Sequence, residues 1–458
     1  MNDITAFFAF LKYCLGYKGD MSRVITGMDW QELYSFASKQ ALLGLCFDGI
    51  ERLGKEYSEE LKQNPIEREL LMTWMGKAQQ IRRQNMKVNA VASKLFSMLR
   101  EDGMRCCVLK GQGNALMYPN PYSRTPGDVD VWIDASRERI MEYAQKKFEL
   151  EDDIRLQHLE TSLDGVPVEL HFFPCSMNNP IYHARLQKWF RRNADLQCSH
   201  IVGLPDEAGD IAIPTTAFNV IYQLCHLYHH FFDEGIGMRQ IIDYFLVVND
   251  FSKNVFLNND LSNHPVNFSN HPVPLSKEGS TFSPSPSSSG SGDVTAPSRC
   301  SEPLRSKDGG PSKVSPDCAG WDRLAIEGDN SAGSTTVVTS STSTALVVVQ
   351  RELKYLGLWK FARAVMYVLH EALGLPEEKM IAPMDEKRGK LLLAEILNGG
   401  NFGKHFTKYG HFTQQGMAMK YFLKIWRNMH FVRYYPAEAL SEPIFRKWHF
   451  FWRLKHRR

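Results

Sequence analysis

Two aspartates stand one residue apart in the stretch GDVDVWID, which otherwise has the valine-rich pattern of a buried strand. Successive side chains of a strand face opposite ways, so Asp128 and Asp130 would project side by side. The opposite face would be apolar, formed by Val129, Val131 and Ile133. Adjacent carboxylates repel each other unless cations lie between them, and magnesium ions prefer carboxylate and phosphate oxygens as ligands. The pair therefore predicts a metal site for phosphate chemistry.

A third acid lies in a later strand-like stretch, VPVELHFF. There the alternation places Glu169 on the face opposite to Val168 and Leu170. If this strand neighbours the first, three carboxylates converge and can hold two magnesium ions, the arrangement that supports in-line phosphoryl or nucleotidyl transfer. The alternative is that Glu169 lies on an edge strand and faces water.

A glycine-containing turn precedes the aspartates. The stretch CCVL predicts a strand, and GQGNALMY predicts the start of a helix, with Lys110 and Gly111 at the junction. Such a turn presents backbone N–H groups to an anion, so a triphosphate could be bound there. Cys106 and Cys107 lie in the predicted strand, and we expect them to be core residues, not nucleophiles.

Two further groups have a functional and a plainer interpretation. His226, His229 and His230 would share a helical face, but no carboxylate at H-E-x-x-H spacing accompanies them, so we expect polar contacts near the active cleft and not a metal site. We expect Arg239 to form an ion pair with Asp243, four residues later on the same helix, and the alternative is that Arg239 contacts a phosphate.

The C-terminal stretch RKWHFFWRLKHRR interleaves basic and aromatic residues without an acid. It could stack on nucleic-acid bases or lie at a membrane surface. We favour a terminal helix that packs its aromatic side chains on the body of the protein.

The elements that must position these groups follow from hydrophobic periodicity. Strands flank the helix SRERIMEYAQKKF, for which Ser136 is the expected N-cap, and helical patterns precede and follow this region. The predicted fold class is α+β, a small mixed β-sheet flanked by N- and C-terminal helical regions. We expect an N-terminal helical region (1–100), a core that contains the sheet (101–205), a helical region packed on the core (206–251), a Ser/Pro/Asn-rich insertion predicted to be disordered (252–345) and a C-terminal helical region (346–458).

Composition excludes several classes of protein. The 458 residues carry a net charge of +3, so no strong overall field selects nucleic acid or membrane as a partner. Nine cysteines form no C-x-x-C pair, which argues against a disulfide framework or structural zinc and favours a cytoplasmic setting. The N-terminus has no signal-peptide pattern, and no run of 18 apolar residues predicts a transmembrane segment.

The motifs together resemble those of a family of uncharacterised bacterial nucleotidyltransferases within the DNA polymerase beta-like superfamily. The matching elements are the Leu109-Lys110-Gly111 turn, Arg124, the Asp128/Asp130 strand, the Glu169/His171 strand, then His230, Gly237, Arg239, Asp243 and the Tyr435-Pro436 step. The resemblance covers most of the chain apart from the low-complexity insertion. It implies that the small sheet is of the nucleotidyltransferase palm type.

The resemblance also implies roles for individual residues. Asp128 and Asp130 would bind two Mg²⁺ ions, and Glu169 would complete the metal site and help to deprotonate the acceptor. The implied reaction is transfer of a nucleoside monophosphate from an NTP to an acceptor hydroxyl. The substrate-binding residues would be Lys110, Gly111, Gln112, Arg124 and Arg239.

The sequence departs from the superfamily at one position of this turn. Gln112 stands where the superfamily usually has a serine whose hydroxyl contacts phosphate. This departure motivates an alternative, a binding or regulatory module that keeps the fold without transfer. A nucleic-acid acceptor contacted by the basic tail is a further, less favoured option.

Overall fold

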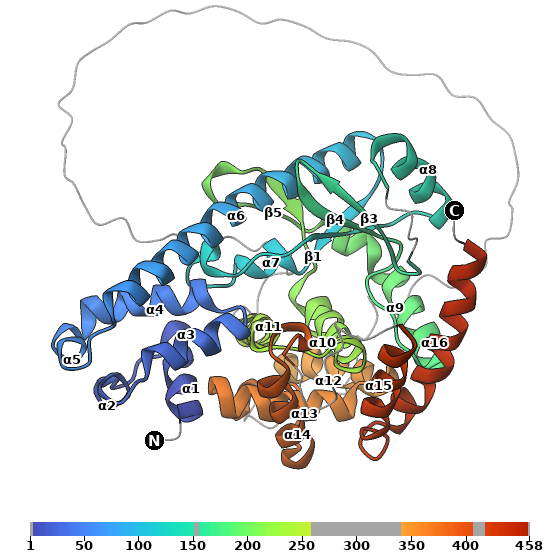
Figure 1. Ribbon diagram of the computed structural model, residues 1–458. Helices are drawn as coiled ribbons and strands as arrows, with labels where there is room; N and C mark the ends of the chain where they lie inside the picture. Colours follow the sequence, from blue (N-terminus) through green and yellow to red (C-terminus); the bar gives the residue numbers. More distant parts are fainter. Residues whose placement is uncertain (1–2, 151–154, 258–339, 406–416, 457–458) are drawn as a thin grey trace, which may run out of the picture. The chain divides into compact units, whose positions relative to one another are not determined.

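The computed structural model describes residues 3–150, 155–257, 340–405 and 417–456. These residues form an α+β protein with a small mixed sheet and many helices, which confirms the predicted fold class (Figure 1). Most of the segment predicted to be disordered, residues 258–339, lies outside the described residues. None of the described helices is long and apolar enough to span a membrane.

Four strands make the main sheet in the order β1-β2-β4-β3. They are β1 Cys106–Leu109, β2 Val129–Ile133, β3 His158–Leu163 and β4 Val166–His171. β1 and β2 are antiparallel, β2 and β4 parallel, and β4 and β3 antiparallel. The sheet is therefore mixed, as predicted, and Asp130 of β2 lies directly opposite Glu169 of β4. A separate short hairpin consists of β5 Ile201–Gly203 and β6 Asp210–Ala212.

One face of the sheet packs on helix α6, which runs for 34 residues, and on α8. The apolar residues of β2 that the alternation predicted for this face, Val129, Val131 and Ile133, all belong to this core. The N-terminal helices are α1 Asp3–Cys14, α2 Ser22–Thr26, α3 Trp30–Lys39, α4 Leu43–Glu56, α5 Ser58–Gln63 and α6 Arg68–Glu101. Helix α8, Arg137–Lys147, begins at the predicted N-cap, because the Ser136 side chain accepts a hydrogen bond from the Arg139 N–H.

The opposite face packs on a larger helical core. Trp132 of β2 stacks on Phe218 of α10, with ring centroids 6.1 Å apart and planes 11° from parallel. The helices of this part are α9 Pro180–Ser199, α10 Thr216–Asp233, α11 Met238–Leu257, α12 Ser340–Tyr355, α13 Trp359–Leu373, α14 Glu386–Gly399, α15 Met417–Met429 and α16 Pro436–His456. Helix α1 contacts both α4 and α13, so segments from the two ends of the chain lie side by side (Figure 1).

The chain leaves β1 through a sharp turn. Lys110 has φ +52° and ψ −127°, and Gly111 has φ +37°, both in the region that favours glycine. A lysine at such a position stores backbone strain, which tertiary contacts must hold in place. The turn leads directly into the short helix α7, Gly111–Ala115, as the glycine pattern predicted.

Candidate active site

The carboxylates singled out in the sequence converge on one face of the sheet. Asp130 and Glu169 are register partners on parallel strands, and the Nε2 atom of His171 lies 2.9 Å from Asp130 Oδ1 and 3.0 Å from Glu169 Oε2. Asp128, immediately before β2, lines the same pocket as Asp130. Glu169 is not on an edge strand, because β4 lies between β2 and β3.

The charges of these groups are strongly coupled. The negative charge of Asp130, together with burial and Glu169, raises the pKa of Asp128 to about 7. Burial opposes ionisation of Asp130, but Lys110 and His171 outweigh it and hold the pKa of Asp130 well below its usual value. Burial likewise opposes a charge on His171, yet its hydrogen bonds to Asp130 and Glu169 raise its pKa to about 9. The site thus balances carboxylates against a lysine and an imidazolium.

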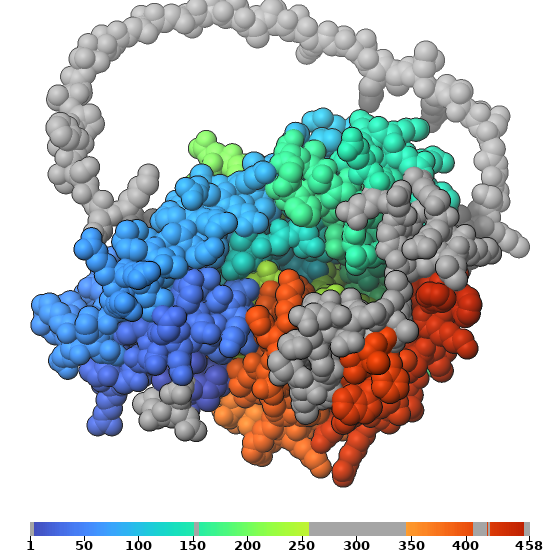
Figure 2. Space-filling view, in the orientation of Figure 1, coloured from blue at the N-terminus to red at the C-terminus, as the bar shows by residue number. Residues whose placement is uncertain are grey.

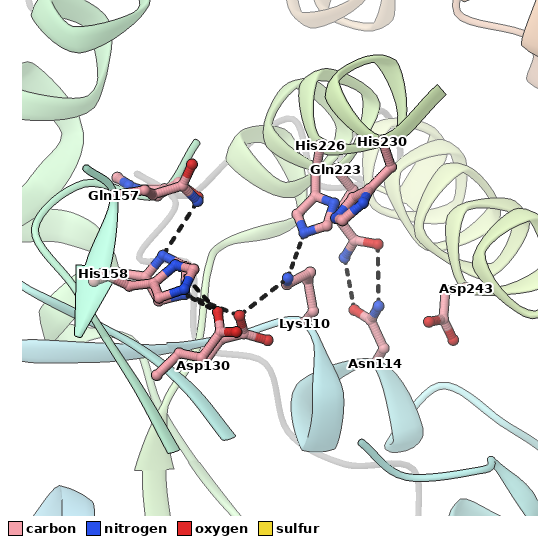
Figure 3. A network of polar contacts seen from close by, with 12 residues as sticks. Lys110, Asn114, Asp130, Gln157, His158, Gln223, His226, His230 and Asp243 are labelled. Carbon is pink, nitrogen blue, oxygen red and sulfur yellow. Dashed lines mark hydrogen bonds and ion pairs between the residues drawn. The ribbon is translucent and has the colours of Figure 1, made fainter. Parts of the chain in front are cut away.

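Lys110 connects the sheet to helix α10. Its Nζ atom lies 3.2 Å from Asp130 Oδ1 and also contacts Nε2 of His226 (Figure 3). Burial, reinforced by Lys110, lowers the pKa of His226 well below its usual value, so the imidazole is neutral and accepts a hydrogen bond from the ammonium group. The centroids of the His226 and His230 rings lie 4.3 Å apart. Of the three histidines expected to make polar contacts, His226 does so through Lys110.

A pocket opens beside these groups. Its lining consists of Lys110, Gly111, Asn114, Arg124, Gly127, Asp128, Asp130, Gln223, His226, Leu227, Arg239, Gln240, Asp243 and Phe402. In the space-filling view, sheet-region residues in teal lie recessed between the blue N-terminal helices and the orange segment near residue 400 (Figure 2). Helix α7 contributes the glycine turn but has only five residues, so its helix dipole is small.

Gln112, which we expected to contact substrate, lies outside the pocket lining. Its side chain is buried and donates a hydrogen bond to the side-chain oxygen Oδ1 of Asn89 in α6. Asn114 of the same helix does line the pocket and exchanges two amide hydrogen bonds with Gln223 of α10 (Figure 3). The helical turn places these two side chains on different faces, which the turn motif alone does not reveal.

The two arginines of the pocket are held differently. Arg124 forms a bidentate, buried ion pair with Asp243 at 2.9 and 2.8 Å, and Tyr118 donates a further hydrogen bond to the same carboxylate. Arg239 donates to the backbone carbonyl of Thr125 instead of forming the helical pair with Asp243. Among the described residues, Arg124 Nη1 and Arg239 Nε have no hydrogen-bond partner, so each guanidinium keeps a donor for a ligand.

Two histidines lie next to the acids, and neither was assigned a role from the sequence. His171 stands two residues after Glu169, so the alternation already placed it on the acidic face. His158 lies directly opposite His171 on β3, a strand that the sequence did not predict. In the C-terminal stretch, the structure describes the side chains as far as Trp452. The Trp448 side chain is exposed. Arg446 forms ion pairs with Glu442 and Asp233.

The donor set fits divalent cations. Three carboxylates lie on one face, where the negative charge of Asp130 raises the pKa of Asp128, and magnesium favours such oxygen ligands. The pocket beside them offers arginine and lysine donors of the kind that bind phosphate. Chemically, the arrangement can hold cations and a polyphosphate next to each other.

Comparison with known proteins agrees with this chemistry. The family model described as "uncharacterised nucleotidyltransferase" matches residues 26–262, a range that contains the sheet, the three acids and both arginines. A comparison with curated proteins gives no significant match. Because the family model covers more than half of the chain, the protein belongs to this family of nucleotidyltransferases and is a transferase.

Proposed function

We propose that the protein transfers a nucleoside monophosphate from an NTP to an acceptor hydroxyl, with pyrophosphate as the leaving group. The observation that carries the proposal is the register of β2 and β4, which sets Asp130, a residue of the pocket lining, directly opposite Glu169. We further propose that Asp128, Asp130 and Glu169 hold two Mg²⁺ ions. When bound, these ions would neutralise charge that develops on the phosphoryl oxygens.

The residues of the chain bind and orient the substrates in this proposal. Lys110 and the unpartnered donors of Arg124 and Arg239 would contact the phosphates of the NTP, with the backbone at Gly111 close by. Glu169, which accepts a hydrogen bond from His171, would help to remove the proton of the acceptor hydroxyl. Gln112 has no contact role here, because its amide is already bound to Asn89. The cytoplasmic setting predicted from the cysteine pattern stays part of the proposal.

The test is Mg²⁺-dependent transfer of label from α-³²P-labelled NTPs to a panel of hydroxyl acceptors: sugar phosphates, aminoglycosides, peptides and RNA. We expect label transfer and pyrophosphate release by the wild type, and a loss of about 100-fold or more in Asp130→Asn. The matched control is Asp164→Asn at the β3–β4 turn, where Asp164 pairs with Lys94 outside the pocket and asparagine tolerates its φ of +51°.

Turnover by Asp130→Asn at the wild-type rate would contradict the proposal. Thermal stabilisation of the wild type by Mg²⁺ and NTP without any product would instead identify the alternative, a binding or regulatory module that has lost transfer.

A further inference from the structure

Two histidines from neighbouring strands stand beside Glu169. His158 of β3 lies directly opposite His171 of β4, and their ring centroids are 5.0 Å apart. Glu169 precedes His171 by two residues on the same strand, so all three side chains project from the same face of the sheet. In Figure 3, His158 lies beside Asp130, on the side away from Lys110 and His226.

The distances between these side chains match those of ligands that share one ion. Glu169 Oε2 lies 3.0 Å from His171 Nε2 and 3.4 Å from His158 Nδ1, and Asp130 Oδ1 lies 2.9 Å from the same His171 atom. Metal–nitrogen and metal–oxygen bonds of about 2.1 Å place neighbouring ligand atoms roughly 3.0–3.4 Å apart at octahedral or tetrahedral angles. One ligand atom from each of His158, Glu169 and His171 lies within 4.8 Å of the other two.

Among the described residues, the imidazole of His158 has two long contacts with carboxylates: Nε2 lies 3.5 Å from Glu160 Oε1, and Nδ1 lies 3.4 Å from Glu169 Oε2. The residue is 8 % exposed, and neither ring nitrogen makes a hydrogen bond to any described residue. Buried polar atoms without partners are rare, because each one costs free energy that folding must offset. A bound ion would satisfy one of these nitrogens. The other ring nitrogen of His171, Nδ1, lies 3.3 Å from Gln157 Nε2, from which it can accept a hydrogen bond only while it is unprotonated. Binding of a metal at Nε2 would move the proton to Nδ1 and break this contact.

We propose that His158, Glu169 and His171, with Asp130 as a fourth ligand, bind a divalent transition-metal ion of the Zn²⁺, Co²⁺ or Mn²⁺ class. Imidazole nitrogens suit these ions, whereas Mg²⁺ requires oxygen ligands in octahedral geometry. In transfer, this ion would take the place of one of the two Mg²⁺ ions, at the Glu169 end of the site; only this part of the inference rests on the proposed function. Binding itself needs no nucleotide.

The experiment uses the full chain, stripped with a chelator and titrated with Zn²⁺, Co²⁺ or Mg²⁺ without nucleotide. We expect one tight site for Zn²⁺ and Co²⁺, at least about tenfold stronger than for Mg²⁺, and a weakening of at least about tenfold in His158→Ala. The control is His200→Ala, because the His200 ring makes a hydrogen bond to the backbone carbonyl of Ile213 and does not belong to the cluster of His158, Glu169 and His171. Circular dichroism establishes that each variant is folded.

A second measurement does not depend on any variant. X-ray absorption at the zinc edge of the loaded wild type should show scattering from two imidazole ligands. A first shell of oxygen alone, equal affinity for Mg²⁺ and Zn²⁺, or an equal loss in His158→Ala and His200→Ala would each overturn the site. Failure of the proposed transfer is scored separately by label transfer with Mg²⁺, so that a wild type that binds Zn²⁺ but transfers nothing refutes only the transfer.

Discussion

Lys110 combines an unusual backbone with contacts to both sides of the site. Its positive φ lets the chain turn directly from β1 into α7, and its ammonium group contacts Asp130 and His226. Tertiary contacts of this kind offset the strain of a non-glycine residue in that region. The same ammonium group lines the pocket, so it is also available to a phosphate.

Removing this ammonium group should weaken NTP binding. We expect Lys110→Met to lower affinity for Mg²⁺-NTP by about tenfold or more, since one charge-assisted contact to phosphate is lost. Equilibrium binding of labelled NTP measures the effect. Lys94→Met, which breaks an exposed pair with Asp164 far from the pocket, is the control. Equal affinity of both variants would show that Lys110 serves only the turn.

The Arg124–Asp243 pair predicts a large effect on stability. Asp243→Asn leaves the buried guanidinium of Arg124 without its counter-charge, and breaking a buried pair in this way costs about 3–5 kcal/mol. Urea unfolding of the wild type and the variant measures the difference in free energy of unfolding. A double variant, Arg124→Met with Asp243→Leu, should recover part of the loss, whereas a loss below about 1 kcal/mol in Asp243→Asn would contradict the argument.

For single residues, the sequence predicted which side chains share a face of one strand. It did not predict which residues far apart in the chain pair with each other. Strand alternation is local, so the common face of Asp128 and Asp130 and the inward apolar face of β2 could be inferred. Arg124 and Asp243 are 119 residues apart, and no local rule links them. The expected helical pair between Arg239 and Asp243 is absent from the described contacts because Arg124 occupies that carboxylate.

Among the elements, β3 shows where sequence patterns fail. Its residues, His158–Leu163, are largely polar, and they form the edge of the sheet beyond β4. Edge strands carry weak hydrophobic alternation and are stabilised by their neighbour, not by their own propensity. The long helices and the valine-rich strands, by contrast, were predicted because each has an apolar face of the right period. Missing β3 also meant missing His158.

A buried carboxylate of helix α16 contacts the start of α9. Glu438, in its first turn, accepts hydrogen bonds from the N–H groups of Asn178 at 2.6 Å and Asn179 at 3.3 Å, just before α9. Burial raises the pKa of Glu438 from 4.5 to about 7. The folded protein therefore holds a proton at Glu438 at pH values where the unfolded chain has released it.

This shift predicts how stability depends on pH. Because the pKa of Glu438 is higher in the folded protein, its contribution to the free energy of unfolding is complete below about pH 4.5. This contribution, up to about 3 kcal/mol, is lost as the pH rises through 7. Glu438→Gln cannot ionise, so its stability relative to the wild type should increase over that interval. Urea unfolding of both proteins at several pH values gives the comparison, and parallel profiles would contradict it.

On the scale of the whole molecule, the sheet separates two hydrophobic cores, and the site lies on the face of the sheet that is turned toward helix α10. The face of β2 toward α6 packs in the smaller core, while Trp132 joins the larger one through Phe218 and Phe190. Helix α10, on which Trp132 packs, also carries Gln223 and His226 into the pocket. Packing at this contact thus sets the distance between the acids and their partners on α10.

Two truncations on opposite faces of β2 separate stability from function. Trp132→Ala should cost about 3–5 kcal/mol and Ile133→Ala about 2–5 kcal/mol in free energy of unfolding. At a temperature where both variants are folded, only Trp132→Ala should also reduce kcat/KM for label transfer, because it loosens α10 against the sheet. Urea unfolding and steady-state kinetics on the same preparations test this. Equal kinetic losses would show that α10 is positioned by other contacts.

The lining of the pocket begins at Lys110 and includes Phe402, whose ring lies 5.4 Å below the Arg239 guanidinium. During synthesis these segments leave the ribosome far apart in time, although domains generally fold as soon as they emerge. A nascent chain with a finished sheet and all three acids would still lack one wall of its cavity. We therefore expect the pocket to be complete only after the segment that carries Phe402 has been translated.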